Sequence, residues 1–134
     1  MSLRIKNIKP EFKDERGFIS RIINDEGYKI SSVLYIERKK GTRGADHYHK
    51  KDAHYVYVLK GKVRRSEKDM TKKNSRIKSA ILKPGDIILT LPMTAHSDEF
   101  LENSILLAFT TKKRNQKDYE KDTVRVGFFK DGSK

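Results

Sequence analysis

Short runs rich in Val, Ile, Tyr and Phe recur along most of this chain, and each is followed by residues that favour turns. Runs of this kind, bounded by Gly, Pro, Asp, Asn or lysine clusters, are typical of β-strands, and helical periodicity is nearly absent. Several short strands at such spacing predict an all-β sandwich or barrel. The predicted strands are Phe18–Ile23, Ser32–Glu37, His54–Leu59, Lys62–Glu67, Arg76–Leu82, Asp86–Leu91, Ala95–Phe100, Ser104–Thr110 and Thr123–Phe129.

Two glycines mark turns between these strands. Gly61 lies between two lysines and can adopt a positive φ, and the sequence Pro84-Gly85-Asp86 has the fixed φ and the permissive residue of a type II turn. Both turns are expected to be hairpin corners. The polar, lysine-rich stretch Glu67–Ser75 is expected to be a loop between strands.

The length and composition limit the classes of protein that need to be considered. With 134 residues and no internal repeat or low-complexity linker, residues 1–134 are expected to form one domain. The absence of cysteine excludes disulfides, thiolate metal sites and thiol nucleophiles. No apolar run reaches the length of a signal core or a membrane span, so we expect a soluble, cytoplasmic protein without a membrane partner.

The formal net charge of +13 permits three interpretations. Clustered lysine and arginine bind the phosphates of nucleic acids, but here the basic residues are spread through every segment and most flank turns. A solvated surface is therefore favoured over nucleic-acid binding. The third interpretation is that positive charge steers an anionic small ligand, such as a sugar nucleotide, toward a cleft.

The four histidines are the first signal of a functional site. Three of them, His47, His49 and His54, fall within eight residues. If His47 and His49 share a strand, their spacing of two directs both imidazoles to the same face, because side chains alternate across a strand. His54 is reached after a short turn, and a barrel can bring the distant His96 back to the same place.

Converging imidazoles favour a divalent transition metal such as Zn, Fe, Ni, Mn or Cu, held by His47, His49, His54 and His96. An alternative keeps the convergence without the metal. In that case one histidine, His47 or His49, acts as a general base, because its ordinary pKa lies near neutrality. Separate pocket or surface histidines are the remaining interpretation.

The spacing around these histidines resembles the first motif of the cupin superfamily. Gly41 is followed by five residues, then by His47-Tyr48-His49, then after four residues by His54 and after six more by Gly61. Most cupins have a glutamate at the position of His54. Gly85 and His96 match the weaker second motif in register. This resemblance implies a cupin-type double-stranded β-helix, the jelly-roll barrel, with the four histidines at the metal-ligand positions.

A second resemblance is to the cupins that epimerise or isomerise nucleoside-diphosphate 4-keto-6-deoxy sugars, the branch of the dTDP-4-dehydrorhamnose 3,5-epimerases. It is carried by Asp14-Glu15-Arg16-Gly17-Phe18, by Thr42-Arg43-Gly44 and by the stretch 117–125. Those enzymes place the first histidine closer to Arg-Gly, whereas Ala45-Asp46 shifts it here. The resemblance implies proton abstraction next to a ketone by His47 or His49, with Arg16 and Arg43 holding the diphosphate.

Further expectations concern aromatic residues and assembly. Tyr48 and Tyr57 flank the histidines and are candidates for stacking on a sugar or a base, although such residues also simply fill barrels. Cupins are commonly dimers, and pairing protects exposed strand edges, so a homodimer is expected. Two other functions remain open at this point: a metal-dependent cupin of different chemistry, and a cupin that binds a small molecule without turnover.

Overall fold

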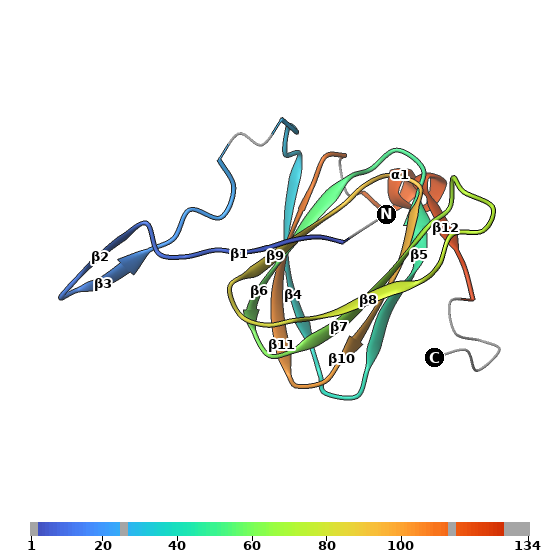
Figure 1. Cartoon of the computed structure of the whole chain (residues 1–134). Helices are drawn as coiled ribbons and strands as arrows, with labels where there is room; N and C mark the ends of the chain where they lie inside the picture. Colours follow the sequence, from blue (N-terminus) through green and yellow to red (C-terminus); the bar gives the residue numbers. More distant parts are fainter. Residues whose placement is uncertain (1–2, 25–26, 113–114, 128–134) are drawn as a thin grey trace.

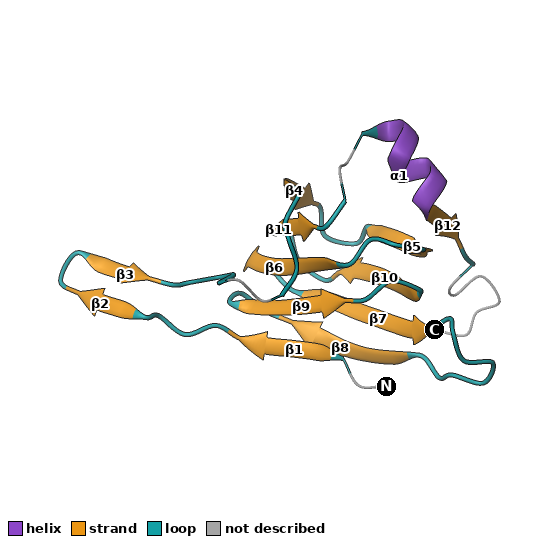
Figure 2. Ribbon diagram, turned by 90° about the horizontal axis from the view of Figure 1, so that it is seen from above, coloured by secondary structure: helices purple, strands orange, loops and turns teal. Residues whose placement is uncertain are grey.

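Two antiparallel sheets of five strands each face one another in the computed structural model, which describes residues 3–24, 27–112 and 115–127 (Figures 1 and 2). The first sheet has the order β1-β9-β6-β11-β4 and the second β12-β5-β10-β7-β8. The strands are β1 (Arg4–Asn7), β2 (Phe12–Asp14), β3 (Gly17–Ile19), β4 (Ser32–Arg38), β5 (Arg43–His49), β6 (His54–Lys60), β7 (Val63–Asp69), β8 (Lys78–Leu82), β9 (Asp86–Thr90), β10 (Thr94–Phe100), β11 (Ser104–Thr110) and β12 (Thr123–Arg125).

The chain passes back and forth between the two sheets. From β4 to β11 every connection crosses from one sheet to the other, except that β7 and β8 pair within the second sheet. This winding is that of a jelly roll, and it confirms the all-β, cupin-type barrel.

The inner faces of the two sheets divide into an apolar half and a polar half. On β6, the side chains of Val56 and Val58 join the buried cluster, whereas His54 lies at the start of the same strand. On β10, Phe100 belongs to the cluster and His96 lies four residues before it. On both strands, therefore, the histidine lies at or near the start and the apolar residues of the cluster lie farther along the strand. The buried apolar cluster consists of Val56, Val58, Val63, Leu82, Ile88, Phe100, Leu106 and Ala108.

The predicted turn glycines adopt the expected conformation but join different partners from those predicted. Gly61 has φ +96° and Gly85 has φ +93°, and the amide of Asp86 donates to the carbonyl of Lys83 at 3.0 Å, as a type II turn requires. The hairpin prediction is wrong at both places, because β6 and β7 lie in different sheets, as do β8 and β9. At Gly61 a Cβ would lie 2.5 Å from the carbonyl oxygen of Asn103, so close packing also requires glycine there.

Most predicted strands are confirmed with shifts of one or two residues at their ends, and the differences lie near the two ends of the chain. The predicted strand Phe18–Ile23 is shorter, because β3 ends at Ile19 and pairs only with β2 in an arm that projects from the barrel (Figure 1). Only residues 123–125 of the predicted strand Thr123–Phe129 form β12, and its residues 128–129 lie outside the described residues. Strands β1, β2 and β5 and the helix α1 (Gln116–Asp122) were not among the predicted elements.

Helix α1 is short and has no buried residues, so its sequence has no apolar periodicity from which a helix could be predicted. Its start follows a local capping pattern: the Asn115 side chain accepts from the amide of Asp118 at 2.9 Å and donates to the Asp118 carboxylate at 2.8 Å. In the described part of the chain, no helix has the length and apolar character that crossing a membrane requires.

Candidate functional site

A β-bulge in β5 decides which side chains of this strand face the barrel interior. Gly44 pairs with Asp98 and His47 with His96, so three residues of β5 cover the same distance as two of β10. Ala45 and Asp46 absorb the extra residue with φ angles of +68° and +59°. The insertion that separates Arg-Gly from the first histidine is therefore taken up by the bulge, and His47 and His49 both line the interior cavity.

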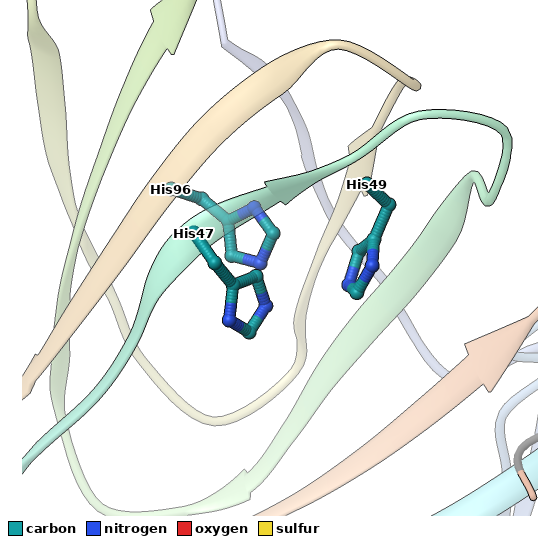
Figure 3. A group of neighbouring side chains, drawn as sticks. All are labelled: His47, His49 and His96. Atoms are coloured by element: carbon teal, nitrogen blue, oxygen red, sulfur yellow. The ribbon is translucent and has the colours of Figure 1, made fainter. Parts of the chain in front are cut away.

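The four histidines come together, as predicted. Ring centroids are 4.7 Å apart for His47 and His49, 4.7 Å for His47 and His96, and 4.9 Å for His54 and His96. The rings of His49 and His54 are 5.7 Å apart. Figure 3 shows His47, His49 and His96, with the rings of His47 and His96 next to each other and His49 beside them.

His49 is the histidine whose protonation is best defined by its neighbours. The hydroxyl of Thr123 donates its one hydrogen to the carbonyl of Tyr119 at 2.6 Å and lies 3.2 Å from Nδ1 of His49. The hydroxyl oxygen must therefore accept from Nδ1–H, which leaves Nε2 as the unprotonated nitrogen of a neutral His49. A carboxylate oxygen of Asp122 lies 3.8 Å from the same Nδ1 and favours a proton there.

The Asp122 carboxylate is itself held in place by the backbone. One oxygen accepts from the amide of Lys51 at 2.8 Å and the other from the amide of Asp52 at 3.1 Å. The pairing of β12 with β5, which sets Thr123 opposite His49, brings Asp122 to this position. Tyr119, one turn earlier in α1, has its ring centroid 5.6 Å from that of His49 and 6.2 Å from that of His47.

His96 is neutral for a different reason. Burial lowers its pKa well below 6.5, and the nearby charges of Arg65, His54 and His47 lower the pKa further. The Nδ1 atom lies 3.2 Å from the carbonyl oxygen of Thr94, which can only accept. Nδ1 of His96 therefore carries the hydrogen, and Nε2 is the nitrogen with the lone pair.

Two cavities meet at this end of the barrel. The interior cavity, of about 370 Å³, is lined by all four histidines, by Arg65 and Asp98, and by Tyr119. A second cavity of about 510 Å³ lies between the β5–β6 turn and α1, and its wall also contains His49 and Tyr119. Four lysines line this second cavity, namely Lys50, Lys51, Lys112 and Lys121.

The histidines fit a metal ion as a set of three. One nitrogen from each of His47, His49 and His96 lies within 4.8 Å of the other two, and imidazole nitrogens suit divalent transition metals. His54 falls in a different group, with His49 and Asp52. Its Nε2 faces the Arg65 guanidinium at 3.3 Å, so this nitrogen is already used as an acceptor.

The predicted substrate-binding residues lie outside the interior cavity. Arg16 is in the β2–β3 arm, where its exposed side chain pairs with Asp14 and lowers the pKa of that carboxyl by hydrogen bonding. The guanidinium of Arg43 contacts the hydroxyl of Ser97 at 2.5 Å, on the side of the sheet away from the histidines. Tyr48 and Tyr57 are half-buried and alternate with the inward residues of β5 and β6. Their roles stay predictions.

Sequence reasoning missed four residues of the site: Arg65, Asp98, Tyr119 and Asp122. The resemblance over residues 117–125 indicated the right segment but not the two side chains that matter in it. Arg65 and Asp98 are buried charges on strands, and nothing in a basic, lysine-rich sequence distinguishes them from the solvated charges around them.

Comparison with known proteins finds likeness in structure alone. No protein-family model matches the sequence, and the comparison with curated proteins finds no match either. A 3,4-ketoisomerase from Helicobacter canadensis superposes with a TM-score of 0.76 at 21% identity, over 93% of this chain and 91% of that chain. A 3,4-ketoisomerase from Thermoanaerobacterium thermosaccharolyticum gives 0.75 at 20% identity, over 95% and 90%.

An epimerase has the same architecture. The dTDP-4-dehydrorhamnose 3,5-epimerase from Sulfolobus tokodaii superposes with a TM-score of 0.75 at 19% identity, over 96% of this chain and 84% of that chain. At such identities the likeness concerns the fold. This chain has the cupin jelly-roll fold, in the form shared by sugar-nucleotide 3,4-ketoisomerases and 3,5-epimerases.

Proposed function

We propose that this protein isomerises or epimerises a nucleoside-diphosphate 4-keto-6-deoxy sugar, with His49 as the base. The observation that carries the proposal is the set of contacts at Nδ1 of His49. Thr123 and Asp122 keep the hydrogen on Nδ1, so that Nε2 has a lone pair at the wall of the cavity. A neutral histidine oriented by a carboxylate is suited to remove a proton from carbon.

The reaction needs no external oxidant. Nε2 of His49 takes a proton from the carbon next to the ketone, the C–H electron pair forms a carbon–carbon double bond, and the carbonyl oxygen becomes an enolate. The Tyr119 phenol, in the same cavity wall, is the donor for that oxygen. Return of a proton to the opposite face of the same carbon re-forms the carbonyl group and gives an epimer. Where that carbon carries a hydroxyl, the former carbonyl oxygen keeps the proton from Tyr119, the former carbonyl carbon takes up a proton, and the neighbouring hydroxyl loses its proton as its oxygen becomes the new carbonyl, which gives the ketoisomer.

The lysine-lined cavity is the proposed place of the diphosphate. It shares His49 and Tyr119 with the histidine cavity, so a sugar at the base and an anionic group among the lysines belong to one continuous ligand. Its three acidic residues are engaged by other partners: Asp122 accepts from backbone amides, Asp52 accepts from Thr111 at 3.0 Å, and Asp118 accepts from the Asn115 side chain at 2.8 Å. The Thermoanaerobacterium ketoisomerase has been solved with TDP and, as a mutant, with TDP-4-keto-6-deoxyglucose.

The test is incubation of the protein with TDP-4-keto-6-deoxyglucose in deuterium oxide, followed by NMR of the sugar. We expect deuterium next to the ketone and a new keto sugar or epimer.

Asp122→Asn is expected to slow this exchange by roughly 100-fold, because the amide no longer favours the Nδ1–H form of His49. Asp69→Asn, a half-buried aspartate outside both cavities whose carboxylate accepts from the nearby Thr71, is the matched control. A folded protein that exchanges no deuterium with this class of sugar contradicts the proposal.

The diphosphate site has its own readout. The double variant Lys50→Gln, Lys121→Gln is expected to raise KM for the sugar nucleotide by about tenfold with little change in kcat, because uniform binding is lost. The double variant Lys39→Gln, Lys60→Gln removes the same charge away from this cavity and is expected to leave KM unchanged. If the two double variants change KM equally, the lysines of this cavity act only through the overall positive charge of the protein, and the proposed diphosphate site is contradicted.

A metal-dependent reaction is the second candidate, favoured by the close grouping of His47, His49 and His96. When bound, such a metal would polarise the carbonyl oxygen of a substrate as a Lewis acid. Elemental analysis of protein purified without a histidine tag or added ions tests this candidate. One equivalent of a transition metal, whose removal abolishes the deuterium exchange, would favour it over the metal-free reaction.

A further inference from the structure

Arg65 lies at the centre of a buried polar network on the floor of the interior cavity. Its side chain is 1% exposed, and burial would by itself lower the pKa of its guanidinium. The carboxylates of Asp98 and Glu67 outweigh burial and raise that pKa above its ordinary value. Arg65 is therefore a permanent cation inside the barrel.

All three nitrogens of this guanidinium donate to acceptors within the network. Nε donates to Glu67 at 3.3 Å, and Nη1 donates to both Asp98 oxygens, at 3.0 and 2.9 Å. Nη2 donates to the hydroxyl of Thr90 at 2.7 Å and to Nε2 of His54 at 3.3 Å. A guanidinium has donors and no acceptor, so every nitrogen of Arg65 is engaged as a donor within the network.

The direction of the hydrogen bond from Arg65 also defines the tautomer of His54. Since an arginine N–H can only donate, Nε2 of His54 must hold the lone pair, and the hydrogen of the neutral ring lies on Nδ1. His49 and His96 also have the lone pair on Nε2, but the hydrogen bonds that define their tautomers are made by Nδ1, to Thr123 and to the Thr94 carbonyl. His54 alone among these three has its Nε2 lone pair directed at a fixed cation.

We propose that Arg65 is a positioning residue that withdraws His54 from metal binding and from proton transfer, so that the site works as three cavity histidines beside one network histidine. A cation bound through Nε2 of His54 would have to displace a guanidinium hydrogen bond and approach the positive charge of Arg65. A metal bound by the group of His47, His49 and His96 is accordingly held without Nε2 of His54.

The first test is the tautomer of His54 in the wild-type protein, measured by long-range proton–nitrogen NMR correlations with the His54 signals assigned from His54→Gln. We expect an unprotonated Nε2 and a protonated Nδ1 for His54. A protonated Nε2, which is the commoner state of a neutral histidine in water, would overturn the proposal. This measurement requires neither substrate nor metal, so it is independent of the proposed function.

The conservative variant Arg65→Lys keeps the charge but loses the planar fork of donors. We expect it to release His54 into a mixture of the two tautomers, whereas Arg64→Lys, one position away on the exposed face and paired with Glu99, leaves the His54 signals unchanged. A His54 spectrum that is identical in folded Arg65→Lys and in the wild type would contradict the positioning role. If Arg65→Lys does not fold, the wild-type tautomer decides the question.

Titration with Zn²⁺ separates the histidines in a second way. His96→Gln is expected to weaken Zn²⁺ binding by at least roughly tenfold, and His54→Gln by less than about twofold. In the wild type, Zn²⁺ is expected to shift the imidazole signals of His47, His49 and His96 and to leave the tautomer of His54 as it was. Equal losses in the two variants, or a coordinated His54, would overturn the proposal.

Discussion

His96 is 3% exposed and lies among groups that disfavour its protonation. The unfolded chain takes up a proton there near pH 6.5, whereas the folded chain resists protonation to a lower pH. Below about pH 6.5 the unfolded state thus binds more protons, and the free energy of unfolding falls as the pH drops toward the lowered pKa of the folded state. Above about pH 6.5 His96 is neutral in both states, and the free energy of unfolding no longer depends on its protonation.

We therefore expect acid sensitivity that depends on His96. The substitution His96→Gln keeps a neutral polar side chain that cannot be protonated. Its free energy of unfolding should fall less than that of the wild type between about pH 7.5 and about pH 5.5, as measured by urea denaturation. If both proteins lose the same stability over this interval, the burial of His96 is not the cause.

At the scale of elements, the bulge in β5 accommodates an extra residue that would otherwise shift the register of the strand. Asp46 is absorbed without changing the register, because Gly44 and His47 remain opposite Asp98 and His96. Deleting Asp46 is therefore expected to leave both histidines of β5 facing the cavity and to change the unfolding midpoint by only a few degrees. The positive φ of the bulge residues disappears with the deletion.

Deleting Tyr48 instead is the matched comparison, since it removes one residue from the regular part of the same strand. The spacing of His47 and His49 then becomes one, so that one of the two must turn to the outer face. We expect a loss of at least about 10 °C in the unfolding midpoint, measured by calorimetry. Equal effects of the two deletions would mean that the bulge does not protect the register.

Helix α1 and β12 act as one element in building the site. The pairing of Thr123 with His49 anchors the segment, and the single turn before it supplies Tyr119 and Asp122. None of these side chains follows an apolar pattern, so their position beside the histidines could not be predicted from periodicity. The contact that caps this helix, from the amide of Asp118 to the Asn115 side chain, is local and does not place the helix beside the histidines.

For the whole molecule, the β2–β3 arm is the feature that bears most directly on assembly. It projects from the barrel in both views, and three of its apolar side chains are well exposed: Phe12 at 59%, Phe18 at 63% and Ile19 at 64% (Figures 1 and 2). An arm of two short strands has little core of its own, and contact with a second copy of the chain would cover these side chains. The predicted homodimer gives the arm such a role.

Light scattering after size-exclusion chromatography tests this assembly. We expect the mass of a dimer for the wild type and that of a monomer for the double variant Phe18→Ser, Ile19→Ser, because the apolar contact of the arm is lost. Ile81→Ser, at an exposed apolar position on β8, is the control that should remain dimeric. A wild-type protein with the mass of a monomer would contradict the predicted homodimer and the role of the β2–β3 arm in it.

The sequence by itself determined most of the strands and the conformation of the two turn glycines, and it predicted that the four histidines converge, because alternation along a strand and the residues that permit turns are local properties. Only the tertiary structure decided which sheet each strand joins, what α1 contributes and what each histidine can do. The state of an imidazole depends on donors and acceptors from distant strands, such as Arg65 for His54 and Thr123 for His49. Those contacts exist only after the barrel has closed.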